Sequence, residues 1–433
     1  MIPPARLQPL LAKSVAVFGG GLSGQGVCAL LQALGAEGCV YDANPEKGRV
    51  FSARHASRHG LVVFSPGFAP AHPWLGLARA AGLDCLGEVD FASLCWAGRL
   101  VAVTGTNGKT TLTEFLTHAL GRLGRAAHAT GNTGHPLSRL VSETRGGIRD
   151  SIAVCEVSSF QAETLQHLRA DATLWTNFAE DHLDRHPGLE GYFNAKWKLV
   201  EHTLPGAVLA GSSVLRHAAT FGHPVSALVT VPTEGQPADP RLVGTVFASL
   251  PQLENFLLAA AWWKVRGFPP EELHAAAGTF RPGRHRLARV AQHEGISYWN
   301  DSKATNFHAV EAALAGFTAP VVLIAGGRAK GGDLAGFVHR IAPHVKHAVL
   351  IGETGAALAF HCSTFRVAHT RCASLDEAVR RATELATGGD HVLLSPGCAS
   401  FDMFRSYEDR GEQFEHLVHA LLRPSGAPAG TLS

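Results

Sequence analysis

The part of this chain that most restricts its fold is the segment Gly105-Thr106-Asn107-Gly108-Lys109-Thr110-Thr111. It follows an apolar run at 100–103 and precedes residues 112–123, where apolar side chains recur at helical spacing. The two glycines let the backbone curl so that its N–H groups, with the positive end of the following helix, can hold a polyphosphate. Lys109 supplies a charge for the β- and γ-phosphates, and Thr110 supplies a hydroxyl for Mg²⁺. The segment therefore predicts an ATP-binding loop between a strand and a helix.

This loop is a shortened form of the usual phosphate-binding pattern, because Val103 stands where that pattern has its first glycine. The alternative interpretation is an ordinary glycine turn before a helix. The order of strand, Gly-Lys-Thr-Thr and amphipathic helix favours the phosphate loop.

Strand and helix signals alternate along the 433 residues, which is typical of α/β proteins with mostly parallel sheets. A chain of this length usually exceeds one core, and we expect three blocks, 1–96, 97–283 and 284–433. Helical patterns are expected to stop at Gly35 and to cover 253–265. Strands are expected at Val15–Phe18, Cys39–Tyr41, Leu61–Phe64, Leu100–Val103, Ile152–Cys155, Ala172–Trp175, Val321–Ala325, Ala348–Ile351 and His391–Leu394.

Two segments give other signals. Residues Pro205–Leu250 are rich in small side chains, and we expect short strands and loops there. The Pro-, Gly- and Ser-rich tail Pro424–Ser433 is expected to be disordered.

Composition excludes several classes of function. The net charge of +2 is close to neutral, whereas binding a nucleic-acid backbone needs a concentrated basic stripe. No apolar run is long enough to span a bilayer, and residues 1–14 lack a signal-peptide core. The 8 cysteines form no C-x-x-C pair and fit buried residues of a reducing compartment. We expect a soluble cytoplasmic enzyme that binds neither nucleic acid nor membrane.

A second glycine cluster follows the first expected strand. Gly19-x-Gly21-x-x-Gly24, with Asp42 at the end of the next strand, matches a dinucleotide-binding fingerprint. One interpretation is a nicotinamide-dependent oxidoreductase. The other is a turn whose backbone N–H groups bind a different nucleotide diphosphate, such as a UDP-sugar. The ATP loop downstream favours the second interpretation, because a dehydrogenase does not need it.

Polar residues follow two strands of the middle block. One strand is followed by Glu156-Val157-Ser158-Ser159-Phe160-Gln161, and the next by Asn177 and by Asp181-His182-Leu183-Asp184-Arg185-His186. Since the carboxyl ends of parallel strands share one edge of a sheet, these side chains are placed to hold Mg²⁺ beside the phosphate loop. His182 and His186, at i and i+4, could also bind zinc, but no third soft ligand accompanies them.

Together these motifs resemble the Mur ligases of peptidoglycan synthesis. The resemblance rests on the phosphate loop, the Glu156 segment, the segment 177–186 and Lys196. Taken alone, Lys196 would be interpreted as a lysine on a helix surface.

The last block narrows the resemblance to family members that add D-glutamate. It rests on Gly283-Arg284-His285-Arg286, on Asn300-Asp301-Ser302-Lys303-Ala304-Thr305-Asn306 and on the string at 394–402. The match runs from about Val15 to Phe414, and the Asn300–Asn306 string is the most specific part of it.

The resemblance implies three domains and a reaction. A Rossmann-like N-terminal domain (1–96) would bind a UDP-sugar, a central P-loop-type ATPase domain (97–283) would bind ATP, and a Rossmann-like C-terminal domain (284–433) would bind the amino acid and close over the site. The carboxylate of UDP-MurNAc-L-Ala (UDP-N-acetylmuramoyl-L-alanine) would attack the γ-phosphate of ATP to form an acyl phosphate. The amine of D-glutamate would then displace phosphate and form an amide. The resemblance also implies a monomer.

The resemblance assigns residues to this chemistry. The implied catalytic residues are Lys109, Glu156, His182 and Lys196. Two Mg²⁺ ions are implied, with Thr110, Glu156, His182 and Lys196 as ligands. In this family the lysine is carbamylated, which would make it an anionic oxygen ligand for a hard cation. Outside the phosphate loop, the implied ATP contacts are Asn255, Arg286, Asp301 and Lys303.

Two further sets follow from the resemblance. The implied UDP-sugar contacts are Gly21, Leu22, Ser23, Gly24, Asp42, Ser65 and Asn132. D-Glutamate is a dicarboxylate, so its pocket needs cations and hydroxyls, and the matching positions are Thr305, Lys330, Ser400 and Tyr407.

The chain departs from the family pattern at three places. Pro251-Gln252 replaces a His-Asn pair that precedes a central-domain helix, Arg328 stands where an acidic residue is frequent, and Tyr407 stands where phenylalanine is common.

Other functions compete with a D-glutamate-adding ligase. Another Mur ligase or a folylpolyglutamate synthase would share the phosphate loop but not the Asn300–Asn306 string. A nicotinamide oxidoreductase would use the first glycine cluster and leave Lys109 without a role. A non-catalytic ATP-dependent switch would bind ATP without forming an amide.

Overall fold

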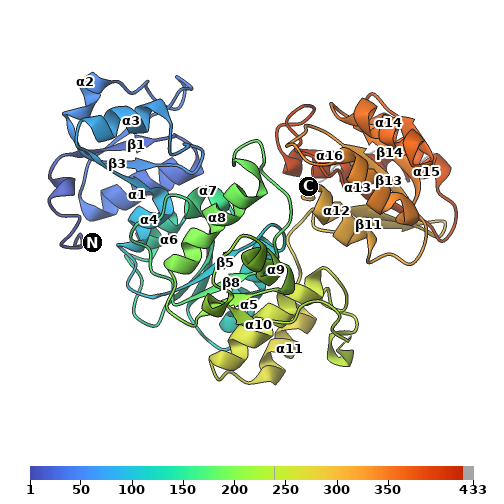
Figure 1. The fold of residues 1–433 in the computed structure, drawn as a ribbon, viewed down its shortest axis with the longest axis horizontal. Helices are drawn as coiled ribbons and strands as arrows, with labels where there is room; N and C mark the ends of the chain where they lie inside the picture. The colour runs from blue at the N-terminus through green and yellow to red at the C-terminus, as the bar shows by residue number, and fades with distance from the viewer. Residues whose placement is uncertain (238, 423–433) are drawn as a thin grey trace. The chain divides into compact units, whose positions relative to one another are not determined.

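The computed structural model describes residues 1–237 and 239–422 and contains three β-sheets (Figure 1). It divides into two compact units. The first comprises Met1–Phe178, Glu190–Ala248 and Gln252–Phe280, and the second comprises Ala179–Leu189, Ser249–Pro251 and the chain from Arg281 onward. The tail expected to be disordered, Pro424–Ser433, lies outside the described residues. Among the described helices, none combines the length and apolar character that crossing a membrane requires.

The first sheet has the parallel order β2-β1-β3-β4. Its strands are β1 (Ser14–Phe18), β2 (Gly38–Tyr41), β3 (His59–Phe64) and β4 (Asp84–Gly87). Helices α1 (Leu22–Leu34) and α4 (Glu88–Ser93) pack on one face, and α2 (Ala53–Ala56) and α3 (Pro73–Ala80) on the other. As expected, α1 ends at Gly35, which adopts the left-handed conformation that glycine allows.

The second sheet, also in the first unit, has the parallel order β10-β9-β8-β5-β7-β6. Its strands are β5 (Arg99–Thr104), β6 (Ala127–Gly131), β7 (Ile152–Glu156), β8 (Ala172–Trp175), β9 (Val208–Ala210) and β10 (Val229–Thr230). The core on one face is formed with α5 (Lys109–Arg122), α10 (Gln252–Val265) and α11 (Pro270–Thr279). Short helices α6 (Leu137–Glu143) and α7 (Ser159–Ala162) and the longer α8 (Gly188–Glu201) complete this part.

Residues 205–250 contain a helix that the sequence analysis did not expect, α9 (Ser212–Thr220). Its buried apolar side chains are only Val214 and Ala218, one turn apart. Such a narrow apolar stripe gives little periodicity to detect, so the prediction of strands and loops alone was wrong here.

The first two sheets share one hydrophobic core. Val15, Val17 and Leu61 of the first sheet belong to the same buried cluster as Leu100 and Ala153 of the second. A buried carboxylate reinforces this junction: Glu88 Oε1 accepts hydrogen bonds from Ser138 N (2.7 Å) and Ser138 Oγ (2.6 Å) at the start of α6. Burial raises the pKa of Glu88.

The third sheet lies in the second unit and has the order β11-β12-β16-β13-β14-β15. All its pairs are parallel except β11 with β12. Its strands are β11 (Ala288–His293), β12 (Ile296–Asn300), β13 (Val321–Gly326), β14 (Val345–Ile351), β15 (His369–Arg371) and β16 (His391–Leu394). Helices α12 (Phe307–Leu314), α13 (Leu334–Ile341) and α14 (Gly355–Thr364) cover one face, and α15 (Leu375–Leu385) and α16 (Tyr407–Leu421) the other.

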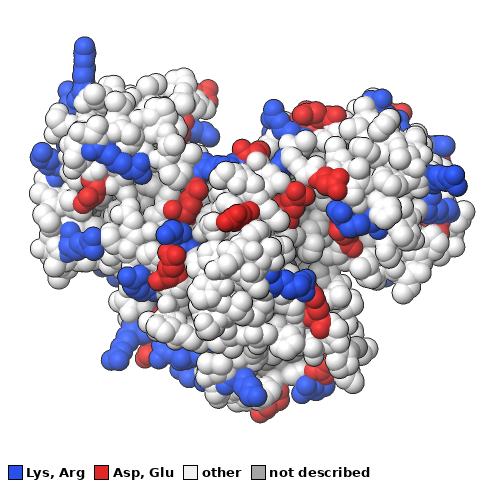
Figure 2. All heavy atoms as spheres, viewed as in Figure 1, with Lys and Arg blue, Asp and Glu red and all other residues white. Residues whose placement is uncertain are grey.

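Charged side chains of both signs are mixed on the face drawn in Figure 2, and most cysteines are buried. In the face drawn in Figure 2, basic and acidic side chains are interspersed, in keeping with the net charge of +2. Cys85, Cys95, Cys155, Cys362, Cys372 and Cys398 are buried, and Cys28 and Cys39 are half-buried. Burial raises the pKa of the Cys85 and Cys362 thiols to about 11, so they remain protonated at neutral pH.

The first glycine turn gives a test of the fold. Gly24 packs so closely on the turn that a Cβ there would overlap the carbonyl oxygen of Gly19, whereas a Cβ at Gly21 would have no atom within 4 Å. Replacing Gly24 by Ala should lower the free energy of unfolding by about 1–3 kcal/mol, as overpacking does. Chemical denaturation of both variants would measure this, with Gly21→Ala as the matched control. Equal stability of the two would contradict the close packing.

Candidate active site

The phosphate loop lies between β5 and α5, as predicted. Gly105 and Gly108 have φ values of +144° and +83°, in the region that favours glycine. A Cβ at Gly105 would overlap the Thr176 hydroxyl, so this position also needs glycine for space. The Lys109 ammonium donates hydrogen bonds to the carbonyl oxygens of Gly105 (3.0 Å) and Thr106 (2.9 Å), which places the charge over the loop.

Two residues at the end of β8 hold this loop in shape. Asn177 Oδ1 accepts a hydrogen bond from Asn107 N (2.9 Å), and its carbonyl oxygen accepts one from Thr106 N (3.0 Å). The Thr176 hydroxyl donates to Asn107 O (2.6 Å). Asn177 was expected among the residues placed to hold Mg²⁺, and no sequence signal marked Thr176; in the structure both side chains contact the backbone of the loop.

Asn255 approaches the loop from α10. It is buried, and a Cβ on Gly108 would come within 2.5 Å of its Oδ1. Its Nδ2 donates to Gln252 Oε1 (2.8 Å), so Gln252, one of the residues that departs from the family pattern, orients the Asn255 amide. Neighbouring Glu254, which the sequence analysis missed, faces Asn177, and burial raises its pKa to about 7.

Glu156, at the end of β7, connects three segments of the first unit. Its carboxylate accepts a hydrogen bond from the Thr110 hydroxyl (2.5 Å) through Oε2 and one from Asn132 Nδ2 (3.0 Å) through Oε1. The Glu156 carbonyl accepts from Asn132 N (3.0 Å). The structure thus brings together three predicted site residues from different loops.

Lys196, on α8, is 1% exposed, so its interpretation as a surface lysine was wrong. Its Nζ donates to Gly105 O (2.8 Å) and lies 3.4 Å from the Thr104 hydroxyl. The Tyr192 ring lies 5.0 Å from the same ammonium. The Tyr192 hydroxyl is 3.4 Å from the Thr106 hydroxyl. Lys196 and Tyr192 therefore both lie against the phosphate loop.

The first glycine turn lies at the carboxyl ends of β1, β2 and β3, which are adjacent in the sheet. Asp42 accepts hydrogen bonds from Gly20 N (2.7 Å) and Asn44 N (2.8 Å), and the one from Gly20 is the main reason that the pKa of Asp42 is lowered. Leu22 is exposed at the start of α1, where Ser23 and Gly24 follow. Ser65 Oγ is buried and has no hydrogen-bond partner among the described residues.

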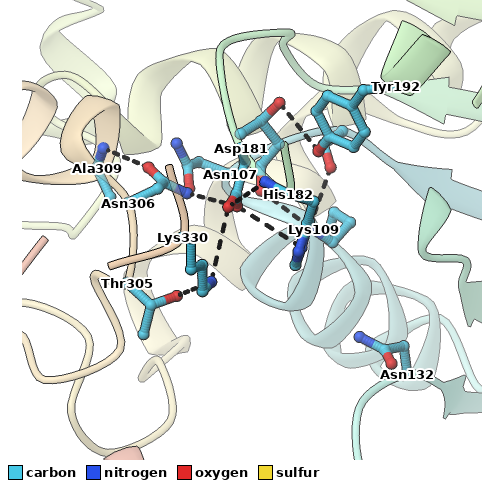
Figure 3. Close-up of polar contacts among 12 residues, drawn as sticks. Asn107, Lys109, Asn132, Asp181, His182, Tyr192, Thr305, Asn306, Ala309 and Lys330 are labelled. Atoms are coloured by element: carbon cyan, nitrogen blue, oxygen red, sulfur yellow. Dashed lines mark hydrogen bonds and ion pairs between the residues drawn. The ribbon is translucent and has the colours of Figure 1, made fainter. Parts of the chain in front are cut away.

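In the second unit, Asp181 lies beside two residues that follow β12 and β13 (Figure 3). Asn306 Nδ2 donates to Asp181 Oδ2 (3.0 Å), and Lys330 Nζ lies 3.6 Å from Asp181 Oδ1. Lys330 also donates to the Thr305 hydroxyl (3.2 Å). His182 follows with a φ of +55°, a sparsely populated conformation that often marks a functional position.

Asp181, Asn306, Lys330 and Thr305 line a hollow in the second unit. Its lining includes Thr305 and Lys330, two of the four residues that the resemblance implies for D-glutamate, together with Glu180, Asp181 and Cys398. Ser400 and Tyr407 are not part of that lining. Ser400 is buried and its carbonyl accepts hydrogen bonds from Met403 N and Phe404 N.

The remaining predicted ATP contacts also lie in the second unit. Asp301 is buried, and its carboxylate accepts hydrogen bonds from Leu287 N (3.1 Å) and the Ser395 hydroxyl (2.8 Å). Burial raises the pKa of Asp301 to about 7. Arg286 is one of the charges that partly offsets this rise. The Lys303 ammonium lies 3.8 Å from the centre of the Tyr407 ring, which joins a predicted nucleotide residue to a predicted amino-acid residue.

Arg328, where the family pattern has an acidic residue, pairs with Glu353 across 3.8 Å. Its backbone forms a bridge with Ala399, which ties the loop after β13 to the loop after β16.

Comparison with known proteins gives consistent matches. The sequence model of the Mur ligase middle domain matches residues 103–221, and that of the Mur ligase glutamate ligase domain matches residues 285–398. A UDP-N-acetylmuramoylalanine–D-glutamate ligase of Thermobifida fusca is 37% identical over 95% of this chain and 99% of its own length. A protein of the same name from Aquifex aeolicus is 34% identical over 93% of this chain and 97% of its own length.

Solved structures agree in fold. The UDP-N-acetylmuramate-alanine ligase MurC of Thermotoga maritima, 15% identical, covers 94% of this chain and 100% of its own with a TM-score of 0.59. A folylpolyglutamate synthase of Mycobacterium tuberculosis, 15% identical, covers 76% of this chain and 92% of its own with a TM-score of 0.54. The chain belongs to the Mur ligase family, in the group of the UDP-N-acetylmuramoylalanine–D-glutamate ligases.

The position of Lys109 gives a test of the site. Replacing it by Ala should lower kcat by about 10²-fold or more, the scale of removing one preorganised electrostatic stabiliser. ATP-dependent phosphate release would measure this. Lys198→Ala is the matched control, because that lysine is half exposed and pairs with Glu201 on the helix surface. Turnover of the Lys109 variant near that of the control would exclude a role in phosphate chemistry.

Proposed function

We propose that this chain joins D-glutamate to UDP-N-acetylmuramoyl-L-alanine with the hydrolysis of ATP, in the cytoplasmic synthesis of peptidoglycan precursors. One observation carries the proposal: the similarity to UDP-N-acetylmuramoylalanine–D-glutamate ligases extends over 95% of this chain and 99% of a relative at 37% identity. The contacts of the phosphate loop and of the hollow in the second unit support it independently.

The proposal includes three domains, 1–96, 97–283 and 284–433, and a monomer as the working form. In support, each of the three sheets is built from strands of one of these blocks. The match to the middle domain falls in the second block and the match to the glutamate ligase domain in the third.

In the proposed reaction, the substrate carboxylate attacks the γ-phosphorus of ATP, ADP leaves, and an acyl phosphate forms. The amine of D-glutamate then attacks the acyl carbon, and phosphate leaves as the amide forms. Both steps bring anions together, so cations and N–H donors must neutralise the charge as it moves. Lys109 and the backbone of the loop, held open by Asn177, are assigned this role.

The donor set at the foot of the loop suits Mg²⁺. The Thr110 hydroxyl and the Glu156 carboxylate are hard oxygen ligands, and Mg²⁺ typically takes one or two protein oxygens together with substrate phosphates. Bound there, Mg²⁺ would neutralise phosphate charge. We assign Glu156, His182 and a carbamylated Lys196 to a second ion, because a carbamate would turn the buried amine into an anionic oxygen ligand.

The UDP-sugar is assigned to the carboxyl edge of the first sheet. Gly21, Leu22, Ser23, Gly24 and Asp42 surround the glycine turn, and the unpartnered Ser65 hydroxyl can donate to a diphosphate oxygen. Asn132, held by Glu156, is assigned to the sugar end of the substrate.

The amino acid is assigned to the hollow in the second unit. A free amino acid carries both charges, and this hollow offers the Lys330 ammonium and Thr305 hydroxyl for a carboxylate and the Asp181 carboxylate for an amine. Ser400 and Tyr407 remain assigned to the second carboxylate of D-glutamate.

An amino-acid panel tests this function. With ATP, Mg²⁺ and UDP-N-acetylmuramoyl-L-alanine, D-glutamate should stimulate phosphate release at least about tenfold more than L-lysine or L-alanine, because a site built to bind two carboxylates rejects amino acids that lack the side-chain carboxylate. Mass spectrometry should show the amide product. Equal stimulation by the other amino acids would show that the assigned substrate is wrong.

Carbamylation of Lys196 is tested separately. Incubation with ¹³C-bicarbonate should give a carbamate carbon signal in the NMR spectrum of the wild type and of Lys198→Ala, but not of Lys196→Ala. The Lys196 variant should lose about 10²-fold in kcat and recover in part with a short carboxylic acid. A spectrum without the signal in the active wild-type enzyme would refute the carbamate.

A further inference from the structure

Arg410, on α16, is the largest charged side chain that the second unit buries completely. Burying a guanidinium costs several kcal/mol unless its donors and its charge are compensated. Burial lowers the pKa of Arg410 to about 10, which leaves the side chain cationic at neutral pH. None of the roles assigned above to the second unit uses this cation.

The guanidinium donates hydrogen bonds to the loops that follow β12 and β16 and lies near the loop that follows β13; these three strands are neighbours in the sheet. Its Nε donates to Ser302 Oγ (3.0 Å) and its Nη2 to Ser302 O (2.8 Å), in the loop after β12. Its Nη1 donates to Cys398 O (3.2 Å), in the loop after β16. At Gly327, in the loop after β13, a Cβ would come within 3.4 Å of the same Nη1.

Each of these loops carries a residue assigned to the amino acid: Thr305 follows Ser302, Lys330 follows Gly327, and Ser400 follows Cys398. Cys398 also lines the hollow. A single side chain therefore joins two of these loops by hydrogen bonds and lies beside the third. A lysine could not do the same, because one ammonium cannot reproduce the planar fork of donors.

The hydrogen bonds of Arg410 all go to neutral oxygens, two carbonyls and one hydroxyl. No carboxylate of residues 1–237 and 239–422 forms an ion pair with it, although the charges of Asp402 and Asp301 partly offset the effect of burial on its pKa. The positive charge is thus held behind the wall of the hollow without a direct counter-ion.

The lining of the hollow needs such a charge to accept a dicarboxylate. It contains two carboxylates, Glu180 and Asp181, but only one cation, Lys330. D-Glutamate brings two carboxylates and one ammonium, so the lining alone would leave excess negative charge in a partly enclosed site. Opposite charges attract more strongly where water is excluded, so a buried cation behind Cys398 would offset this excess.

We propose that Arg410 is a positioning residue for the amino-acid pocket, which joins the loops after β12 and β16 beside the loop after β13 and supplies positive charge that favours a dicarboxylic amino acid. This inference rests on the proposed function. It predicts that Arg410 affects the binding of the amino acid but not the binding of ATP or the UDP-sugar.

The test compares Arg410→Gln, Arg410→Lys and the wild-type full-length enzyme in the phosphate-release assay. Arg410→Gln should raise KM for D-glutamate about tenfold or more, the scale of losing a charge-assisted contact, with KM for ATP changed less than about twofold. It should also reduce the preference for D-glutamate over D-glutamine, which a purely structural defect would not do. Arg410→Lys, which keeps the charge, should raise KM about threefold and retain the preference.

The matched control is Arg380→Gln, since Arg380 is exposed on α15 and pairs with Asp376. It should behave as the wild type. An unchanged KM and preference in Arg410→Gln, in an enzyme that D-glutamate stimulates, overturns the role of Arg410 alone. If Arg410→Gln does not fold, an unchanged KM for D-glutamate in Arg410→Lys overturns it. A wild type that D-glutamate does not stimulate overturns the proposed function and this inference with it.

Discussion

The carboxylate of Glu156 joins three segments of the first unit. It is buried at the end of β7 and accepts hydrogen bonds from Thr110, at the start of α5, and from Asn132, in the loop after β6. A buried carboxylate is stable only when its oxygens are satisfied, so the helix and the loop after β6 are held in one arrangement around it. The same oxygens make this point suitable for a hard cation.

Parallel strand topology explains why so many separate segments contribute to each site. β6, β7, β5 and β8 are neighbours in this order in the second sheet. Glu156 is the last residue of β7, and Asn132, the phosphate loop and Asn177 lie just beyond the ends of β6, β5 and β8. The third sheet repeats the arrangement with β12, β16 and β13, which precede Ser302, Cys398 and Gly327. Side chains from helices outside each edge pack against these loops: Asn255 on α10 lies close to Gly108 in the first unit, and Arg410 on α16 donates hydrogen bonds to two loops in the second.

Sequence patterns predicted elements whose signals are local. Each strand expected from an apolar run is present, because buried parallel strands have continuous apolar sequences. The phosphate loop was predictable for the same reason, since all its chemistry lies in seven consecutive residues. Signals that depend on other segments were lost: α9 has only Val214 and Ala218 to mark its buried face, and nothing around Lys196 indicates that α8 carries it beneath the loop.

The sequence by itself determined the α/β class, the phosphate loop and, through the strings at 156–161 and 300–306, the family. These follow from residue order, since glycine conformations, helix dipoles and strand periodicity act over a few residues. Only the tertiary structure decided which groups meet: Lys303 with Tyr407, Lys330 with Asp181, and Arg410 with the loops after β12 and β16. Such contacts join positions up to 149 residues apart, as for Lys330 and Asp181, and burial and charge compensation, which act in space, select them.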